Sequence, residues 1–554
     1  MKSAVLAPLL LAALAVGRLP AATPPLPGVT LRPAEEINLW PGAAPGEQGD
    51  IGPERIVPQR PRPFDQITDV SVPTLAVFHP PADKRLGTGL LVIPGGGLDR
   101  LAIETEGYEI AEWLNAHGLT AFMLKYRVPA RSGGPRYKVG LQDAQRAMGL
   151  IRARAAEWKV DADAIGAIGF SAGAEISVLL SVFHAEPRQY EPVDEADKLS
   201  TRPDFDIALY AGGITDFRAG TLREDIATRL GKSPPTFIVH AFDDAAMSSI
   251  VLMQALKRAN LASELHIFSA GAHGFGARDT GLPVGRWREL ALDWLGTQGF
   301  LDPADVRAFA REWGAGSRPR FRTLAPNGNL AQAYAAQRRI VADTLRRGGA
   351  VAGYKGMFTT GAAGSPAHGV LFKAGRIEAA AGTVRAVAHE PSLLIETGIG
   401  YVIATDIATK LRVPRQALTA VEALVPVIEL PRSPGGIVDG KLTVDPLDAI
   451  AGNVGSNRFI VGPSIAPEKI ANLDTLAVAL RRDRRVLHET TGADARAGQA
   501  QVLMTLINQI VEQGRILHRG DIIITGALGG AKPAEKGAYA ADFGALGKIE
   551  LRIE

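Results

Sequence analysis

Residues 167–177, AIGFSAGAEIS, form the stretch that decides the fold of the first half of this chain. Apolar residues lead into Gly-Phe-Ser-Ala-Gly, and a second apolar segment follows it. A strand that passes through G-x-S-x-G into a helix holds the serine on a tight turn with its hydroxyl exposed. We therefore expect Ser171 to be a nucleophile. The alternative is a glycine-rich turn between a strand and a helix that has no chemical role.

Predicted strands and helices alternate on both sides of this stretch. Apolar runs that end in proline or glycine predict strands, and amphipathic segments predict helices. Strands are expected at residues 70–80, 87–97, 119–128, 165–170, 205–213, 236–242 and 262–270, and helices at 106–118, 139–158, 173–184 and 286–299. This alternation predicts an α/β fold with a doubly wound, mostly parallel sheet that helices cover on both faces.

A serine hydroxyl needs a base to remove its proton, and the base needs an acid to orient it. His273 follows a predicted strand in the glycine-rich segment SAGAHGFG, and Asp243 and Asp244 follow another in FIVHAFDDAAM. Parallel sheets carry their chemistry at the carboxyl ends of the strands. The order serine, aspartate, histidine is that of α/β-hydrolases, so we predict a triad of Ser171, His273 and one of the two aspartates.

Ester hydrolysis also needs backbone N–H donors for the oxyanion that develops on the substrate. The segment VIPGGGLDR, residues 92–100, places a glycine loop directly after a predicted strand. We expect the N–H groups of Gly96, Gly97 and Ala172 to be these donors. A dinucleotide-binding loop is the competing interpretation, but PGGG lacks the spacing G-x-G-x-x-G.

The alternating pattern ends near residue 313, and a segment rich in glycine, proline and arginine follows. We assign residues 23–316 to the first domain, 317–327 to a linker and 328–554 to a second domain. The second domain opens with a predicted helix at residues 330–348 and then becomes rich in strands. These are expected at 352–360, 392–405, 423–431, 458–463, 520–526 and 546–554.

Composition and the N-terminus limit the partners and the location of the protein. The formal net charge is only +3 and no more than two lysines or arginines are consecutive, so we expect no nucleic-acid partner. The absence of cysteine excludes disulfides and thiolate metal sites. A lysine, an apolar run and small residues within 1–22 predict a signal peptide; a buried N-terminal strand or helix is the alternative. We expect an exported protein, periplasmic or secreted, with no membrane segment after cleavage.

Residues 35–300 resemble the acetyl-xylan-esterase-like α/β-hydrolases, through LWPGAAPG, VIPGGG, LKYRVP, IGFSAG and SELHIFSAGAHGFG. The resemblance implies that Asp244, rather than Asp243, is the acid of the triad. It also implies a serine esterase that needs no cofactor and acts on an acylated carbohydrate or another small ester. The chain departs from the family pattern at DDAAMSS, where DDPVVP is usual, and at Leu98, where an aromatic residue is usual.

Residues 328–554 resemble the fumarylacetoacetase-like fold, in particular its 2-oxopent-4-enoate hydratase and oxalocrotonate decarboxylase branch. The resemblance rests on GYKGMFTT, LIETGIGYVIATDI, VEALVPVIEL and the closing GDIIITG…ADFGALGKI. It implies a mixed, β-rich domain with Lys355 in its site. It further implies Mg²⁺ or Mn²⁺ held by three carboxylates, of which Glu396 and Glu429 would be two.

The third ligand of that pattern falls on Gly398, and Gly452 stands where the family has an acid beside Asn453. Three interpretations stay open: a domain without turnover, a weakened metal-dependent 2-oxo acid lyase, and a working site completed by Glu390 or Asp406. A non-catalytic binding or dimerisation module is a further possibility, and it would make the protein a homo-oligomer.

Overall fold

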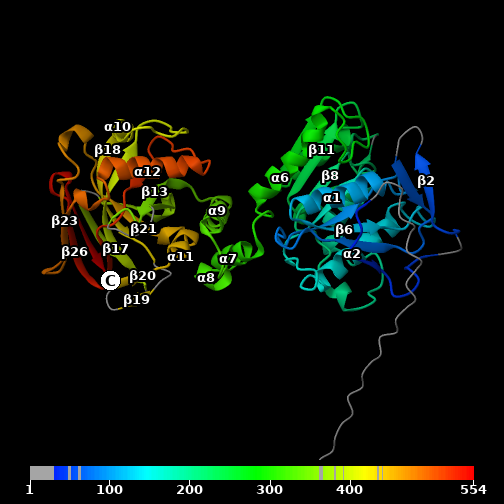
Figure 1. Cartoon of the computed structure of the whole chain (residues 1–554), viewed down its shortest axis with the longest axis horizontal. Coiled ribbons are helices and arrows are strands. Elements are labelled where there is room, and N and C mark those ends of the chain that lie inside the picture. The colour runs from blue at the N-terminus through cyan, green and yellow to red at the C-terminus, as the bar shows by residue number, and fades with distance from the viewer. Residues whose placement is uncertain are drawn as a thin grey trace, which may run out of the picture. The chain divides into compact units, whose positions relative to one another are not determined.

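The computed structural model describes residues 30–47, 51–59, 64–216, 218–360, 366–379, 382–390, 392–432, 436–438 and 441–554. The predicted signal peptide, residues 1–22, lies outside the described residues. The chain divides into two compact units, Met1–Leu301 and Asp302–Glu554 (Figure 1). The boundary falls after Leu301, whereas the sequence places it after residue 316.

The N-terminal unit is built on an eight-stranded sheet with the strand order β1-β4-β6-β5-β7-β8-β11-β12. Strands β1 and β4 pair antiparallel at one edge, β4 pairs antiparallel with β6, and the pairs from β6 to β12 are parallel. The strands are β1 Glu35–Asn38, β4 Thr74–Phe78, β5 Gly89–Ile93, β6 Thr120–Lys125, β7 Ile165–Phe170, β8 Asp206–Leu209, β11 Thr236–Ala241 and β12 Ser263–Phe268. This is the α/β architecture that the alternating pattern predicts.

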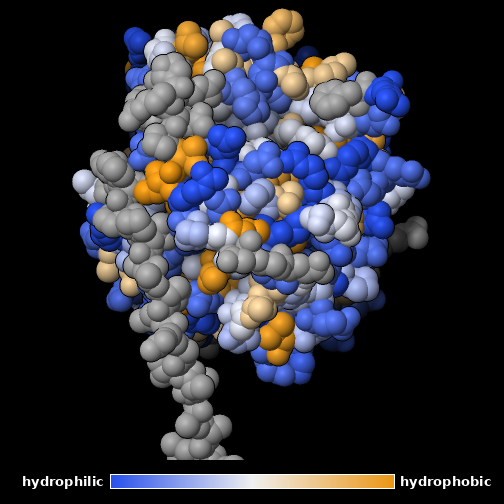
Figure 2. All heavy atoms as spheres, turned by 90° about the vertical axis from the view of Figure 1, so that its right-hand side faces the viewer, coloured by the Kyte–Doolittle hydropathy of each residue, from blue (hydrophilic) through white to orange (hydrophobic). Residues whose placement is uncertain are grey.

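Helices pack against this sheet, and strands β4, β5, β6, β7, β8 and β11 have only buried residues. The helices are α1 Glu109–Ala116, α2 Lys138–Ala153, α3 Ala172–Val182, α4 Glu224–Ala227, α5 Met247–Arg258 and α6 Trp287–Gln298, and a π-helical turn at Glu104–Tyr108 precedes α1. Two short hairpins add β2 Arg55–Gln59 with β3 Phe64–Thr68, and β9 Thr215–Asp216 with β10 Thr221–Leu222. The face of this unit shown in Figure 2 carries its hydrophobic residues in small groups among hydrophilic ones.

Several elements of this unit differ from the sequence-based expectation: the short strands β2, β3, β9 and β10 are not predicted, and neither are strand β1 and helix α5. Strand β1 lies in a proline- and glycine-rich stretch before the first predicted strand, and its pairing with β4 makes it a sheet edge. Helix α5 joins β11 to β12 in a segment for which the sequence analysis assigns no helix. Its buried Val251, Leu252 and Leu256 pack into the core.

The C-terminal unit begins with three helices, α7 Ala304–Gly314, α8 Phe321–Leu324 and α9 Leu330–Arg346. Phe309 of α7 and Phe321 of α8 are fully buried in a cluster with Ala333 and Ala336 of α9. This packing explains the boundary after Leu301, because α7 belongs to the core of the second unit. The predicted linker therefore contains a buried aromatic residue.

Two sheets follow in the C-terminal unit. The larger has the order β14-β13-β24-β17-β18-β21-β15, and β25 also pairs with β17; the smaller has the order β16-β27-β26-β22-β23. The strands are β13 Val351–Met357, β14 Ala367–Phe372, β15 Arg376–Glu378, β16 Thr383–Val387, β17 Leu394–Ile403, β18 Val421–Leu430, β21 Arg458–Val461, β22 Ala477–Arg482, β23 Arg485–Thr491, β24 Ile522–Ile524, β25 Leu528–Pro533, β26 Gly537–Asp542 and β27 Lys548–Ile553, with the hairpin β19 Gly436–Val438 and β20 Lys441–Thr443.

Helix α12, Gln499–Glu512, packs into this second core. Its Leu503, Leu506 and Ile510 are fully buried together with Tyr401 of β17. The shorter helices are α10 Pro414–Thr419 and α11 Pro446–Ala451. Within the part of the chain that the structure describes, no helix has the length and apolar character needed to cross a membrane.

Candidate active sites

Ser171 occupies a strained turn between β7 and α3. Its backbone has φ 54° and ψ −117°, a conformation that non-glycine residues rarely adopt. The flanking glycines are required by close backbone packing: a Cβ on Gly169 would lie 2.4 Å from Gly173 O, and one on Gly173 would lie 2.1 Å from Ile93 O. The turn therefore has the geometry that the motif G-x-S-x-G predicts.

The structure brings Ser171, His273 and Asp244 together in one hydrogen-bonded line. Ser171 Oγ lies 2.8 Å from His273 Nε2, and His273 Nδ1 lies 2.6 Å from Asp244 Oδ2. The His273 side chain is half exposed, whereas that of Asp244 is largely buried. This arrangement allows His273 to accept the hydroxyl proton of Ser171 while Asp244 fixes its orientation.

Asp243 and Asp244 have separate contacts, although they are neighbours in the sequence. Asp243 accepts hydrogen bonds from the backbone N–H groups of Gly271, at 3.2 Å, and Ala272, at 2.9 Å. Ala272 has φ 53° and directly precedes His273. Asp243 thus holds the loop that carries His273, and Asp244 contacts the imidazole itself.

The pKa of Asp244 lies below its usual value. Burial alone would raise this pKa, but hydrogen bonds from His273, from the Ala245 N–H and from His240 stabilise the carboxylate and lower it. Asp244 is therefore ionised at neutral pH, as a group that orients and stabilises an imidazolium must be.

The glycine loop after β5 lies beside Ser171. A Cβ on Gly95 would lie 2.8 Å from Ser171 Cβ and 2.5 Å from Phe170 O. Among the described residues, the N–H groups of Gly96, Gly97 and Ala172 donate to no protein acceptor. These three predicted oxyanion donors remain candidates for a ligand oxygen.

Glu106 and Tyr210 contact the glycine loop and the His273 ring. Glu106 is buried and accepts hydrogen bonds from the Gly95 N–H, at 2.7 Å, and from Tyr210 Oη, at 2.9 Å. Burial raises the pKa of Glu106. The Tyr210 ring packs edge-on against the imidazole of His273, with centroids 5.1 Å apart. Neither Glu106 nor Tyr210 belongs to the motifs from which the triad and the glycine loop are predicted.

The second candidate site lies on β13, β17 and β18 of the C-terminal unit. Lys355 Nζ lies 3.2 Å from Glu396 Oε2 and 2.9 Å from Glu429 Oε2. Glu396 and Glu429 are directly paired residues on the antiparallel strands β17 and β18. All three side chains are buried. The structure therefore brings together the lysine and the two carboxylates that the sequence predicts.

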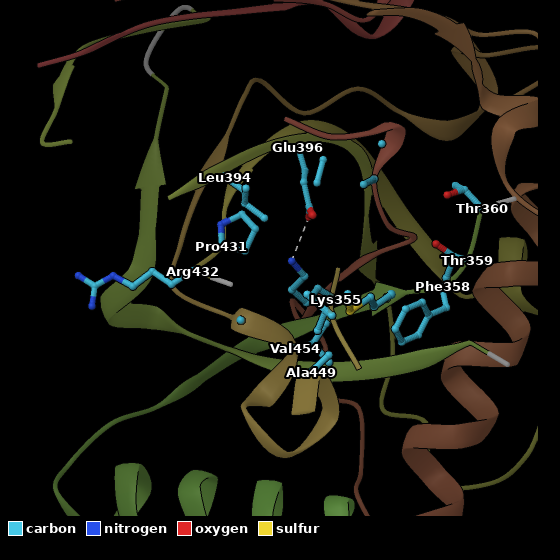
Figure 3. A pocket seen from close by; sticks show the side chains of 17 residues that line it. Lys355, Phe358, Thr359, Thr360, Leu394, Glu396, Pro431, Arg432, Ala449 and Val454 are labelled. Carbon is cyan, nitrogen blue, oxygen red and sulfur yellow. Dashed lines mark hydrogen bonds and ion pairs between the residues drawn. The ribbon is translucent and has the colours of Figure 1, made fainter. Parts of the chain in front are cut away.

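A cavity of about 220 Å³ opens beside this cluster. Figure 3 shows Lys355 and Glu396 directed toward each other within it, and Arg432 extending away from them. Lys355 and Glu396 line the cavity together with the apolar residues Met357, Phe358, Leu394, Pro431, Val444, Ala449, Val454, Ala527 and Ala531.

The charges of the cluster are strongly coupled. Burial acts to lower the pKa of Lys355, but Glu396 and Glu429 outweigh it and raise this pKa. Burial raises the pKa of Glu429 to about 7, although Lys355 opposes the rise. Glu429 Oε1 has no hydrogen-bond partner among the described residues. Lys355 therefore stays cationic at neutral pH, while Glu429 titrates there.

The residues present do not fit a three-carboxylate metal site. Gly398 lies two residues from Glu396 on the same face of β17, but a Cβ there would already lie 2.7 Å from Ile524 Cγ2. A Cβ on Gly452 would lie 3.0 Å from the Trp313 ring. An isoleucine methyl and an indole therefore fill the space beside the two positions where the family pattern has acids.

The two substitute ligands considered from the sequence are engaged elsewhere. Glu390 pairs with Arg432 and Arg458. Asp406 accepts from the backbone N–H of Arg519 and contacts His518. The described residues contain no group of three His, Asp or Glu side chains that could hold a metal ion. The interpretation that Glu390 or Asp406 completes the site gains no support, because both carboxylates have ion-pair or hydrogen-bond partners outside the cluster.

Comparisons with known proteins match both halves of the chain. The BD-FAE family model matches residues 75–231. An acetylxylan esterase from Xylanibacter ruminicola is 28% identical over 202 residues, which make up 34% of this chain and 41% of that protein. A 2-keto-4-pentenoate hydratase from Paraburkholderia xenovorans is 23% identical over 171 residues, which make up 30% of this chain and 61% of that protein. The chain thus spans about two fifths and three fifths of the lengths of these relatives.

One solved structure covers a similar share of the chain. The 4-oxalocrotonate decarboxylase from Pseudomonas putida G7, complexed with magnesium and adipate, has a TM-score of 0.41 at 22% identity and covers 45% of this chain and 97% of that chain. The curated relatives show that the chain joins a region similar to acetylxylan esterases to a region similar to 2-keto-4-pentenoate hydratases and 4-oxalocrotonate decarboxylases.

Proposed function

We propose that the N-terminal unit is a serine hydrolase of carboxylic esters. The observation that carries this proposal is the hydrogen-bonded line from Ser171 Oγ through His273 to Asp244 Oδ2. Such a line makes a weak hydroxyl nucleophilic without any cofactor. The strained conformation of Ser171 supports the same function, because strain of this kind concentrates at reacting residues.

The reaction follows from this geometry in two steps. Ser171 Oγ attacks the ester carbonyl while His273 Nε2 takes its proton, and Asp244 stabilises the imidazolium. The oxyanion lies against the N–H groups of Gly96, Gly97 and Ala172, and His273 returns the proton to the leaving alcohol. A water molecule, activated by His273, then attacks the acyl group on Ser171 and releases the acid.

We propose acylated carbohydrate as the substrate class, and acetate as the acyl group. The similarity to the acetylxylan esterase of Xylanibacter ruminicola supports this choice. Polymeric carbohydrate lies outside the cell, and the predicted signal peptide at residues 1–22 fits an exported protein, periplasmic or secreted.

The test is acetate release from acetylated xylan and from p-nitrophenyl acetate by the full chain and by Ser171→Ala. We expect both substrates to be hydrolysed and kcat to fall on the order of 10⁴-fold or more in the variant. Ser263→Ala is the matched control, because its hydroxyl donates to Leu261 O at the start of β12. Equal turnover by Ser171→Ala and the wild type would falsify the proposal, and hydrolysis of the aryl ester alone would exclude xylan.

For the C-terminal unit we propose a metal-independent binding pocket for a small, uncharged molecule. Lys355 has three N–H donors, two of which face Glu396 and Glu429, so one remains for an acceptor on a ligand. The two carboxylates disfavour an anionic ligand beside them. Most residues that line the cavity are apolar or glycine, and its further polar members are Thr359, Thr360 and Arg432, of which Arg432 is paired with Glu390. A carbonyl group on an apolar body of modest size meets these conditions.

Calorimetric titration of the full chain with MgCl₂ and MnCl₂ tests this second proposal. We expect no saturable binding at millimolar metal, because Ile524 and Trp313 fill the space beside the positions of the missing acids. Binding of one metal ion that Glu396→Gln abolishes would overturn the proposal and favour a metal-dependent 2-oxo acid hydratase or decarboxylase. Glu378→Gln is the control for exposed carboxylates, since Glu378 pairs with Arg376 on β15.

A further inference from the structure

A second histidine contacts the acid of the proposed triad. His240 lies on β11, four residues before Asp244, and is almost fully buried. Its Nε2 lies 3.0 Å from Asp244 Oδ2, the same oxygen that lies 2.6 Å from His273 Nδ1. Its other ring nitrogen, Nδ1, lies 2.8 Å from Ser249 Oγ on α5. One carboxylate oxygen thus stands between two imidazoles.

The partners of His240 determine which nitrogen carries its proton. Asp244 is ionised and only accepts, so Nε2 must carry the hydrogen. Burial lowers the pKa of His240, so the ring is neutral at neutral pH and Nδ1 is an acceptor. Ser249 then donates its hydroxyl hydrogen to Nδ1. Each group in this chain therefore donates to the next: Ser249 to His240, and His240 to Asp244.

We propose that His240 is a positioning residue of the esterase: its Nε2–H holds Asp244 Oδ2 in place and limits how strongly that oxygen pairs with His273. This inference rests on the proposed esterase function. The two ring nitrogens of His240 are engaged by Asp244 and Ser249, so the ring acts on Ser171 and His273 through Asp244. Besides the two histidines, Asp244 receives a backbone hydrogen bond from Ala245.

Loss of the His240 hydrogen bond has two separable consequences. Asp244 loses one of its side-chain donors, so its carboxylate can rotate and the orientation of His273 becomes less fixed. The remaining carboxylate also pairs more strongly with the imidazolium of His273, because it shares its charge with one donor fewer. The charged groups that act on His240 are Asp244 and His273. Glu106 also interacts electrostatically with His273, and it is unchanged in each variant.

The experiment compares His240→Ala, His240→Gln and Ser249→Ala in the full chain with p-nitrophenyl acetate from pH 5 to 9. For His240→Ala we expect kcat to fall on the order of 10- to 100-fold with KM little changed. We also expect the acidic limb of the profile of kcat/KM to move to higher pH. His240→Gln keeps an N–H donor near the Nε2 position and should restore most of kcat and the wild-type limb. Ser249→Ala should lower kcat less, because it removes the hydrogen bond that fixes the tautomer of His240 but keeps the imidazole ring in place.

His184→Gln is the matched control, because His184 is a partly buried histidine that contacts Ser181 O, outside the triad. It should leave kcat and the pH profile unchanged. The inference is wrong if folded His240→Ala and Ser249→Ala keep kcat within twofold of the wild type, or if His240→Gln is as impaired as His240→Ala with an unmoved acidic limb. If His240→Ala does not fold, the inference is wrong if folded Ser249→Ala keeps kcat within twofold of the wild type. Failure of the esterase proposal itself is distinct: the wild type would then show no turnover that depends on Ser171.

Discussion

The two candidate sites of this chain differ in what surrounds their glycines. In the N-terminal unit, a Cβ on Gly173 would meet the backbone oxygen Ile93 O at 2.1 Å. In the C-terminal unit, a Cβ on Gly398 would meet a side-chain methyl of Ile524 at 2.7 Å. Backbone cannot move aside without loss of the sheet, whereas a side chain is exchanged by one substitution.

This difference distinguishes a glycine that the geometry of a site requires from a glycine that stands where the family pattern has a functional side chain. Gly173 lets the α3 turn approach β5 and so positions Ser171 beside the glycine loop. Gly398 and Gly452 stand where the family pattern has acids, and Ile524 and Trp313 occupy the space beside them. Lys355, Glu396 and Glu429 remain as a buried ion cluster whose contribution to stability can be measured independently of activity.

The largest expected effect separates the two neighbouring aspartates of the acid loop. Asp244→Asn should lower kcat on the order of 10⁴-fold, because an amide at this position cannot stabilise the imidazolium of His273. Asp243→Asn keeps an acceptor for the N–H groups of Gly271 and Ala272, so its loss should be on the order of tenfold or less. Both variants are assayed by steady-state hydrolysis of p-nitrophenyl acetate.

A larger loss of kcat in Asp243→Asn than in Asp244→Asn would identify Asp243 as the acid of the triad and contradict the assignment made from the hydrogen bonds. Far-ultraviolet circular dichroism of each variant controls for unfolding. The same two variants also test whether the N-terminal site is intact. A site that had lost its function, as we infer for the metal site of the C-terminal unit, would tolerate both changes.

The sequence supports a prediction of the first site because its parts are short motifs in a known chain order. Ser171, His273 and Asp244 each follow a predicted strand, and parallel strands bring their carboxyl ends together. Glu106 and Tyr210 lie in none of these motifs, and their contact joins elements far apart in the chain. His240 lies within FIVHAFDDAAM, but the sequence does not show that its ring nitrogens contact Asp244 and Ser249. The positions of Ile524 beside Gly398 and of Trp313 beside Gly452 are likewise set by tertiary packing.

The fold shows the same distinction between features that local sequence predicts and features that tertiary packing sets. Buried apolar runs predict the strands β5, β7 and β11 correctly, because a strand covered on both faces is continuously apolar. Strand β1 escapes prediction, since it is a short edge within a proline-rich stretch. The boundary after Leu301 also escapes, because α7 is amphipathic and only its contact with α9 shows which core it joins.

The next largest effect concerns the stability of the C-terminal unit. Lys355→Met leaves Glu396 and Glu429 buried without their cation, so we expect the unit to lose about 3–5 kcal/mol of unfolding free energy. Hydrogen exchange of the β17 and β18 amides in the full chain measures this loss. Lys536→Met is the control at an exposed lysine.

Esterase activity should be unchanged in Lys355→Met, because the residue belongs to the other unit. Unchanged exchange of β17 and β18 would show that the ion cluster contributes nothing to stability. A fall in esterase kcat at unchanged β17 exchange would contradict the independence of the two sites.

The smallest expected effect is a pH dependence that has opposite signs in the two sites. Burial raises the pKa of Glu429 to about 7 from 4.5 in the unfolded chain, so the folded chain holds a proton that the unfolded chain has released. Stability from this group is complete below about pH 4.5 and is lost as the pH rises toward 7, by up to about 3 kcal/mol. The lowered pKa of Asp244 has the opposite sign, since its contribution is lost as the pH falls.

Glu429→Gln removes the titrating proton and keeps the shape of the side chain. The free energy of unfolding of the variant, measured by exchange of the β18 amides at pH 5 and pH 8, should therefore rise relative to that of the wild type as the pH increases. Glu422→Gln, at an exposed position on the same strand, should show no such change. Parallel behaviour of Glu429→Gln and the wild type would mean that Lys355 keeps Glu429 ionised throughout. The cluster would then be a permanent ion pair, whose stability Lys355→Met alone would report.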